Sequence, residues 1–310
     1  MIEPGIALAG LAIGFLVGLT GMGGGALMTP TLVFLFNVNP LTAVSSDVVT
    51  SLFMKPAGAI VHLVRRTAEL RLVGWLCLGS VPAAFLGALA IDRLRGSPGF
   101  EEWLLRGLGV ALLLTAGGLI SRAWTTMVTH RSATGEGPAA PTRPDIVIRP
   151  LPTVLLGAVA GALVGMTSVG AGSLVITVLL LIYPTLKPSQ LVGTDLVQAI
   201  PLVASASLGH LLFGEVSFTL TASLLVGAVP GAFLGAQVSS RAPGGLIRRA
   251  LAVLLTASGL KLVGAPTWVV LGAGVAGLVI GPLLWALAKR RFRGTRAHAG
   301  GLSRGEIDDV

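Results

Sequence analysis

The ionisable side chains inside the apolar segments of this sequence follow a helical spacing. Asp47, Ser51, Lys55, Gly58 and His62 are separated by 4, 4, 3 and 4 residues. This spacing places them on one stripe of a single helix. An ionisable group deep in a bilayer is costly unless it is paired or hydrated, so the stripe is expected to face protein or a water-filled path. The stripe is therefore a candidate functional site, with Asp47 and His62 as candidate carriers of a coupling proton.

A second, looser polar face occurs later in the chain. It consists of Thr194, Asp195, Gln198, Ser205 and His210. Asp195 and His210 are candidate proton carriers by the same argument. A structural interpretation stays open for all of these groups. Each aspartate could cap a helix N-terminus, Lys55 could pair with Asp47, and the histidines could pack at the membrane interface.

Glycine clusters interrupt the apolar pattern. Residues 21–25 read Gly-Met-Gly-Gly-Gly, although each glycine costs about 1 kcal/mol relative to alanine in a helix interior. This cluster lies in an apolar run from 5 to 37, and a second run of the same length extends from 151 to 183. One helix of that length would measure about 50 Å, whereas the hydrocarbon core of a bilayer is about 30 Å thick. We therefore predict that each run is a broken helix or a hairpin that turns back within the membrane.

The composition places these segments in a membrane. Of the 310 residues, 53% are hydrophobic and only 11% are charged, with a mean hydropathy of +0.87. A soluble domain carries about 25% charged residues, so this chain is predicted to be an all-α integral membrane protein. The net charge of +9 comes from short loops and the tail "KRRFRGTR". That distribution suits the cytoplasmic edge of a bilayer and does not indicate a nucleic-acid partner.

Eight or nine hydrophobic segments can be placed along the chain. The expected organisation is a first membrane repeat over 1–123, a flexible cytoplasmic linker over 124–150 and a second repeat over 151–264. An additional transmembrane helix over 265–288 and a basic polar tail over 289–310 follow. The linker is rich in Pro, Gly, Ser and Thr, which is typical of flexible segments.

The two halves resemble each other. With a shift of 147 residues, Gly14, Gly18, Thr20, Gly23, Gly25 and Leu27 align with Gly161, Gly165, Thr167, Gly170, Gly172 and Leu174. With a shift of 148, Asp47 aligns with Asp195, His62 aligns with His210, and "VPAAFLGA" (81–88) aligns with "VPGAFLGA" (229–236). This agreement predicts an internal duplication, which is common in secondary transporters.

The distribution of basic residues predicts that the second copy is inverted. The loop with Arg65, Arg66 and Arg71 is expected inside, whereas the corresponding loop near Glu215 lacks Lys and Arg and is expected outside. The loop with Arg241, Arg248 and Arg249 and the basic tail are expected inside. Inversion requires an odd number of crossings in each half, which a broken or re-entrant opening pair allows.

Other chemistry is absent from the sequence pattern. Cys77 is the only cysteine, so no intrachain disulfide or thiol redox motif is expected. No His or Cys group has metal-ligand spacing, and the glycine cluster is followed by Ala26-Leu27 instead of the Lys-Ser/Thr of a phosphate-binding loop. No convincing Ser-His-Asp arrangement is visible. The chain is therefore not expected to be an enzyme or to bind a metal or cofactor.

The paired glycine segments resemble a known family. "GFLVGLTGMGGGALMTPTL" (14–32), its counterpart "GALVGMTSVGAGSLVITVL" (161–179) and the two Asp-His helices are similar to the sulfite exporter TauE/SafE family over about residues 5–264. The resemblance implies a bacterial multi-pass permease that moves sulfite or an organosulfonate across the cytoplasmic membrane. The sequence departs from the family pattern at Val17 and Val164, where Ser is common, and in its second cluster, where Ser168, Ala171 and Ser173 replace Gly.

A broken helix offers a way to bind such an anion. Free N–H groups and the positive helix end at each break can hold an oxyanion, and glycine lets it approach the backbone. The predicted substrate-binding residues are Thr20, Gly21, Gly23, Gly24, Gly25, Lys55, Thr167, Ser168, Gly170, Gly172 and Ser173. Lys55 would offset the charge of the anion, while Gly14, Gly18, Gly161 and Gly165 are expected to serve helix packing.

The predicted function is alternating-access transport of a small sulfur-containing anion, with proton coupling. A passive anion channel and a non-catalytic membrane subunit of a larger complex are the alternatives. The expected partners are the anion, protons and the lipid bilayer, and a homo-oligomer is compatible with the sequence. The linker and tail are expected to be cytoplasmic.

Overall fold

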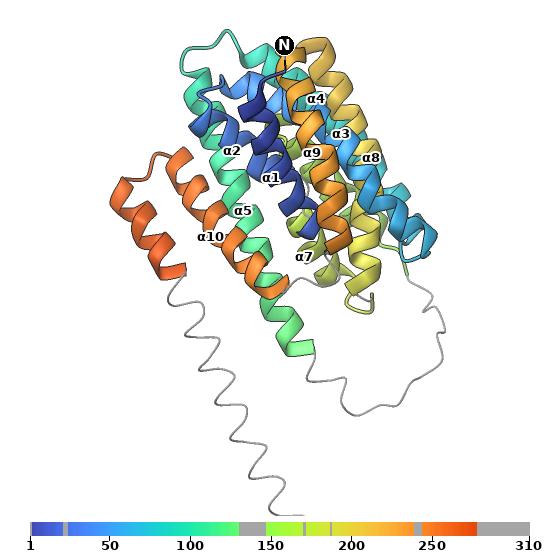
Figure 1. Ribbon diagram of the computed structural model, residues 1–310. Helices are drawn as coiled ribbons and strands as arrows, with labels where there is room; N and C mark the ends of the chain where they lie inside the picture. The colour runs from blue at the N-terminus through green and yellow to red at the C-terminus, as the bar shows by residue number, and fades with distance from the viewer. Residues whose placement is uncertain are drawn as a thin grey trace, which may run out of the picture.

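A computed structural model describes residues 2–20, 24–129, 147–169, 172–186, 188–238 and 244–277. Within these ranges all regular secondary structure is helical. The first five helices are α1 (Pro4–Thr20), α2 (Gly25–Leu35), α3 (Pro40–Val64), α4 (Leu70–Leu94) and α5 (Phe100–Thr129). The next five are α6 (Pro150–Thr167), α7 (Gly172–Ile182), α8 (Pro188–Phe213), α9 (Phe218–Val238) and α10 (Gly244–Leu262). A further helical segment, Thr267–Gly277, packs beside α10 (Figure 1).

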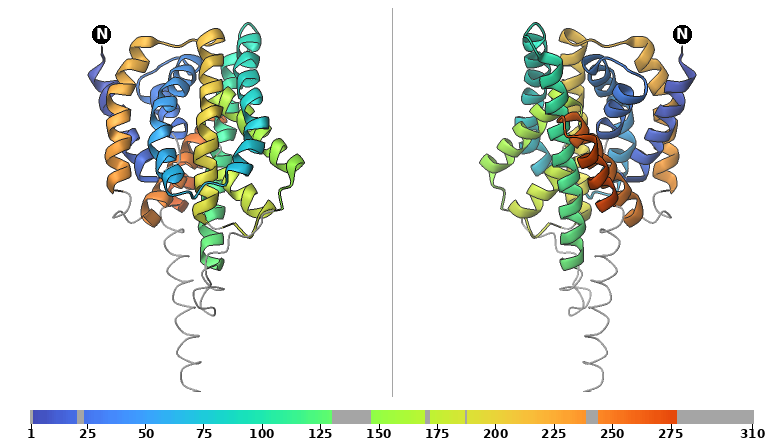
Figure 2. Two further views of the ribbon diagram at one scale, coloured as in Figure 1. Left: turned by 90° about the vertical axis from the view of Figure 1, so that its right-hand side faces the viewer. Right: turned by 90° about the vertical axis from the view of Figure 1, so that its left-hand side faces the viewer.

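Helices from the two parts of the chain pack against each other in one bundle (Figures 1 and 2). The most extensive packing joins α1 to α9 and α4 to α6, and α5 lies along α10. The buried apolar side chains form two main clusters, each with helices from before and after residue 140. Helix α3 contributes Ala43 and Met54 to one cluster and Val44 and Val48 to the other. The middle of α3 therefore lies between the two apolar cores.

Several helices are suited to crossing a membrane. Five described spans have the length and apolar composition required: Leu70–Leu94, Phe100–Ser121, Pro150–Thr167, Ser189–Phe213 and Phe218–Val238. Large apolar side chains such as Leu78, Leu86 and Phe233 are exposed on these helices. Exposed apolar surface is stable where the surroundings are lipid, so the structure supports the predicted integral membrane protein.

The two long apolar runs are interrupted, as the sequence predicts. The first run divides into α1 and α2 and the second into α6 and α7. Helices α2 and α7 have 11 residues each, or about 17 Å, which is too short to cross a hydrocarbon core of about 30 Å. The ends of each pair meet: Phe36, after α2, lies beside Gly5 of α1, and the Tyr183 hydroxyl, after α7, lies 2.7 Å from Oγ1 of Thr153 in α6. Each pair is therefore a hairpin.

Glycines allow the closest approaches between helices in this structure. A Cβ added to Gly14 or Gly18 would collide with the backbone of α9 at Ala228 or Ala232. A Cβ added to Gly161 or Gly165 would collide with the backbone of α4 at Ser80 or Ala84, respectively. Glycines of α9, Gly227, Gly231 and Gly235, meet the α1 backbone in the same way. The predicted packing role of Gly14, Gly18, Gly161 and Gly165 is confirmed, because small residues let helices approach closely.

The structure also bears on the segment boundaries. Helix α5 continues to Thr129, beyond the expected end of the first repeat at residue 123. Most of the predicted linker, residues 130–146, lies outside the described residues. The predicted closing helix is described only as Thr267–Gly277, and the predicted tail lies outside the described residues.

Candidate functional site

One buried carboxylate joins three helices. Asp47 of α3 has no solvent exposure. Its Oδ2 atom accepts a hydrogen bond of 2.7 Å from Oγ1 of Thr29 on α2 and one of 2.9 Å from Oγ of Ser168, just after α6. A buried charged group is tolerated only when such hydrogen bonds replace its hydration. Asp47 thus lies at the point where both hairpins approach the centre of the bundle.

The second oxygen of this carboxylate has no protein partner. Oδ1 of Asp47 is buried and makes no hydrogen bond within the described part of the chain. A Cβ added to Gly24, directly before α2, would lie 3.7 Å from this oxygen and 3.4 Å from Oγ of Ser51. The first N–H groups of α2 begin here, and the positive end of a helix dipole favours a nearby anion. The carboxylate of Asp47 therefore occupies the environment that the sequence predicts for a substrate anion.

The two helix breaks touch each other directly. A Cβ added to Gly25 would overlap the carbonyl oxygen of Ser168, so only glycine fits at this contact. Ser168 itself has φ 58°, a left-handed conformation at the C-terminal end of α6. Such a conformation is unfavourable for a residue with a side chain, and here it accompanies the hydroxyl hydrogen bond to Asp47. Gly24, Gly25 and Ser168, all predicted site residues, are brought together.

Thr29 was missed by the sequence analysis. Its hydroxyl holds Asp47 from α2, and its position four residues after Gly25 puts both on one face of the helix. Ser51 was placed on the polar stripe without a role, yet it lies beside Gly24. A search for hydroxyl residues one turn after the glycine break would have found Thr29, because that turn faces the same neighbours as the break.

Asp195 has a different environment from Asp47. It lies in α8 with 6% of its surface exposed. Nε2 of Gln198 approaches Oδ1 of Asp195 at 3.5 Å, and Oε1 of Gln198 accepts a hydrogen bond of 3.2 Å from Oγ of Ser80. The neighbouring Thr194 accepts a hydrogen bond of 3.0 Å from the backbone N–H of Glu69. This polar face therefore connects α8 to α4 and to the residue before it.

The positive charge of Lys55 acts on both aspartates. Its ammonium is attracted by the carboxylates of both Asp195 and Asp47. It forms no ion pair of 4.0 Å or less in the described part of the chain. Both aspartates lie about two turns inside their helices, α3 and α8. The interpretation of these aspartates as N-caps is therefore wrong, whereas Lys55 interacts with Asp47 at longer range than a direct ion pair.

The two histidines have different partners. In His210, Nε2 lies 2.8 Å from the carbonyl of Gly165, which requires an N–H at this nitrogen. Nδ1 of His210 then accepts the hydrogen bond of 3.0 Å from Oγ of Ser45. His62 is half-buried, with its Nδ1 2.8 Å from Oγ1 of Thr67. Proton coupling through either histidine stays a prediction.

Other predicted ligands serve the helix ends or lie outside the description. Thr20 and Thr167 each donate to the carbonyl four residues earlier, at 2.8 Å and 2.6 Å. This is a known local bond of threonine. Gly172 begins α7. The predicted site residues Gly21, Gly23 and Gly170 lie outside the described residues, as does the side chain of Ser173.

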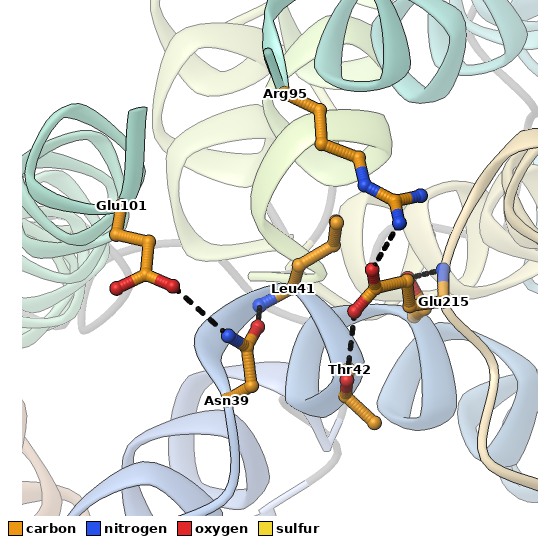
Figure 3. A network of polar contacts seen from close by, with 7 residues as sticks. Asn39, Leu41, Thr42, Arg95, Glu101 and Glu215 are labelled. Carbon is orange, nitrogen blue, oxygen red and sulfur yellow. Dashed lines mark hydrogen bonds and ion pairs between the residues drawn. The ribbon is translucent and has the colours of Figure 1, made fainter. Parts of the chain in front are cut away.

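A polar network connects the loops at one end of the bundle (Figure 3). Arg95, after α4, forms an ion pair of 2.5 Å with Glu215, between α8 and α9. The other carboxylate oxygen of Glu215 accepts from Oγ1 of Thr42 at 3.3 Å, and Asn39 donates to Glu101 at 3.1 Å. These contacts tie the start of α3 to loops from both parts of the chain.

Comparison with known proteins identifies the family. The family model described as "Sulfite exporter TauE/SafE" matches residues 6–262. "Probable membrane transporter protein YjnA" of Bacillus subtilis (strain 168) is 37% identical over 262 residues, which cover 83% of this chain and 98% of that protein. "Probable membrane transporter protein YdhB" of the same organism is 25% identical over 259 residues, with the same coverage of 83% and 98%. No solved structure matches. The chain therefore belongs to the sulfite exporter TauE/SafE family and is a multi-pass membrane transporter.

Proposed function

We propose that this protein is a secondary transporter that moves a small sulfur-containing anion, sulfite or an organosulfonate, across the bacterial cytoplasmic membrane. The substrate class is supported by the family to which the chain belongs. In this proposal the linker and the tail lie on the cytoplasmic side of the membrane. The basic residues from Lys289 onwards support that orientation. The anion binds where the helix breaks of the two hairpins meet, beside Gly24 and Gly25.

One observation carries the mechanism: the Oδ1 atom of Asp47 lies buried at the start of α2 and has no hydrogen-bond partner among the residues that the structure describes. A substrate anion at Gly24 would lie close to this carboxylate. Two like charges about 4 Å apart repel by about 4 kcal/mol at an effective dielectric constant of 20. The anion therefore binds with Asp47 neutralised, and the simplest neutralising species is a proton. Of the four predicted proton carriers, Asp47 is therefore the one that we propose.

The proposed movement is a rocking of two inverted repeats. Helix α1 packs on α9 and α6 packs on α4, so each hairpin is attached to the opposite half of the chain. Contacts between glycine backbones provide smooth surfaces along which helices can shift. Alternating access between inverted repeats places the substrate at the repeat interface. The contact between Gly25 and Ser168 lies at that interface.

Flux measurement in proteoliposomes tests the proposal. Purified protein is reconstituted, and sulfite and taurine entry are followed with and without an imposed pH gradient. We expect saturable flux of one of these anions, accelerated by the gradient. Equal flux in both conditions would contradict proton coupling.

Two further measurements separate the alternatives. Unlabelled anion inside the vesicles should accelerate entry of labelled anion through a transporter, but not through a passive channel. The Gly24→Ala variant should fold, because its methyl group makes only ordinary contacts, and should lose flux because the methyl group covers the anion position. Normal flux through Gly24→Ala would show that the anion does not bind at this break.

A further inference from the structure

We propose that the Asp47 carboxylate is also a sodium site, in which Na⁺ takes the place of the coupling proton. Only the role of this site in transport rests on the proposed function. The binding of Na⁺ itself can be measured on purified protein without any substrate anion. The proposal starts from a buried carboxylate oxygen, Oδ1 of Asp47, that has no hydrogen-bond partner among the described residues.

The hydrogen-bond donors to this carboxylate are hydroxyl groups. Hydroxyls of Thr29 and Ser168 lie 2.7 Å and 2.9 Å from Oδ2 of Asp47. The hydroxyl of Ser51 is next to the same Gly24 backbone that Oδ1 faces. Hydroxyl and carboxylate oxygens are ligands for hard cations. One soft atom, the sulfur of Met54, also lies here, 3.6 Å from the position of a Cβ added to Gly24.

The end of α6 adds a favourable field for a cation. The last carbonyl groups of a helix have no partner within the helix, and that end carries partial negative charge. The carbonyl of Ser168 is directed at Gly25, in the contact between the breaks. Interrupted membrane helices can coordinate Na⁺ with such carbonyls. The site therefore combines the negative end of α6 with the carboxylate of α3.

The charge of the surroundings favours a monovalent ion. A calcium site usually gathers several carboxylates among six to eight oxygen ligands, whereas Asp47 is the only carboxylate in the hydrogen-bonded group described here. The charge of Lys55 on α3 acts on Asp47 and on Asp195 of α8, and His210 of α8 is hydrogen-bonded to Ser45, two residues before Asp47. Helices α2, α6 and α9 contain no ionisable residue, and those of α5 lie towards its ends. Na⁺ and H⁺ should therefore compete for one carboxylate.

Thermal unfolding in detergent tests the site. NaCl is compared with KCl and choline chloride at constant chloride and ionic strength, at several pH values. A ligand that binds only the folded state raises the melting temperature. At a Na⁺ concentration about ten times the dissociation constant, we expect a rise of about 3 °C. The rise should shrink as the pH is lowered, because protons occupy Asp47.

Matched variants locate the effect. Asp47→Asn should abolish the Na⁺-dependent rise. Thr29→Val should weaken it by removing one ligand oxygen. Thr31→Val should leave it intact, because within the described residues that hydroxyl bonds only to the carbonyl of Leu27 in its own helix. An equal rise with choline, or a full rise in a folded Asp47→Asn or Thr29→Val protein, would overturn the proposal. Na⁺ binding without anion flux would leave the sodium site standing and reject the proposed function alone.

Discussion

The environments of Asp47 and Asp195 differ although the two aspartates occupy corresponding positions in the chain. Asp47 is held by hydroxyls from both hairpins and faces the glycine break. Asp195 is approached by Gln198 of its own helix. Polar residues near Asp47 correspond to apolar residues near Asp195. The positions corresponding to Thr29, Ser51 and Lys55 are Ile176, Ala199 and Val203.

This difference indicates that the predicted duplication does not extend to the residues that surround Asp47. The second half contributes Ser168 to the carboxylate of the first half, and its positions corresponding to Thr29 and Ser51 carry no hydroxyl. A single built site at the contact between the breaks is therefore the more economical arrangement for binding one anion.

The largest expected effect separates the two aspartates directly. A gradient of two pH units can drive accumulation of about 100-fold when one proton accompanies each anion, since each unit corresponds to a factor of ten. Asp47→Asn should lose this accumulation while retaining anion exchange, because the asparagine is permanently neutral. Asp195→Asn should retain gradient-driven accumulation. Uptake and exchange are measured in the same vesicle preparations. Loss of accumulation in Asp195→Asn, with accumulation retained in Asp47→Asn, would assign the coupling role to Asp195.

The contact between the breaks should be sensitive to a single methyl group. In Gly25→Ala the new Cβ would collide with the carbonyl of Ser168, and such overpacking costs about 2–3 kcal/mol. Gly117→Ala, in α5, is the control, because a Cβ there meets nothing within 4 Å. Thermal unfolding in detergent should show a lower melting temperature for Gly25→Ala alone. Equal melting of the two variants would mean that the breaks do not touch.

The strained cap of α6 predicts a smaller, graded effect. Ser168→Ala and Ser168→Gly both lose the hydrogen bond to Asp47, but only glycine relieves the left-handed backbone. The alanine variant should therefore be less stable than the glycine variant by about 1 kcal/mol. Comparison of their melting temperatures is the test. Equal stability would show that the backbone at Ser168 is not left-handed in solution.

The loop network should make the smallest contribution to stability. The ion pair between Arg95 and Glu215 is partly exposed, and such pairs contribute about 0–1 kcal/mol. Glu215→Gln should lower the melting temperature slightly, and added salt should reduce the difference from the wild type. A large loss of stability would mean that this network, and not the contact at Asp47, holds the two parts of the chain together.

Much of the fold could be predicted from the sequence because its signals are local. Composition indicated a membrane protein, and the lengths of the two apolar runs indicated the interruptions between α1 and α2 and between α6 and α7. Resemblance to a family supplied the transporter class, which the comparison confirmed. The site was only partly predictable. Gly24, Gly25, Asp47 and Ser168 were selected from sequence, whereas Thr29 was not, because nothing local shows that its hydroxyl meets Asp47.

The sequence by itself determined that this chain is apolar enough for a membrane, where its helices are broken and which charges are buried in them. These properties follow from residue type and spacing along one helix. Only the tertiary structure decided that the carboxylate of Asp47 faces the start of α2, and that Ser168 at the end of α6 donates a hydrogen bond to it. The physical reason is that these contacts join residues far apart in the chain, whose meeting depends on how the helices pack.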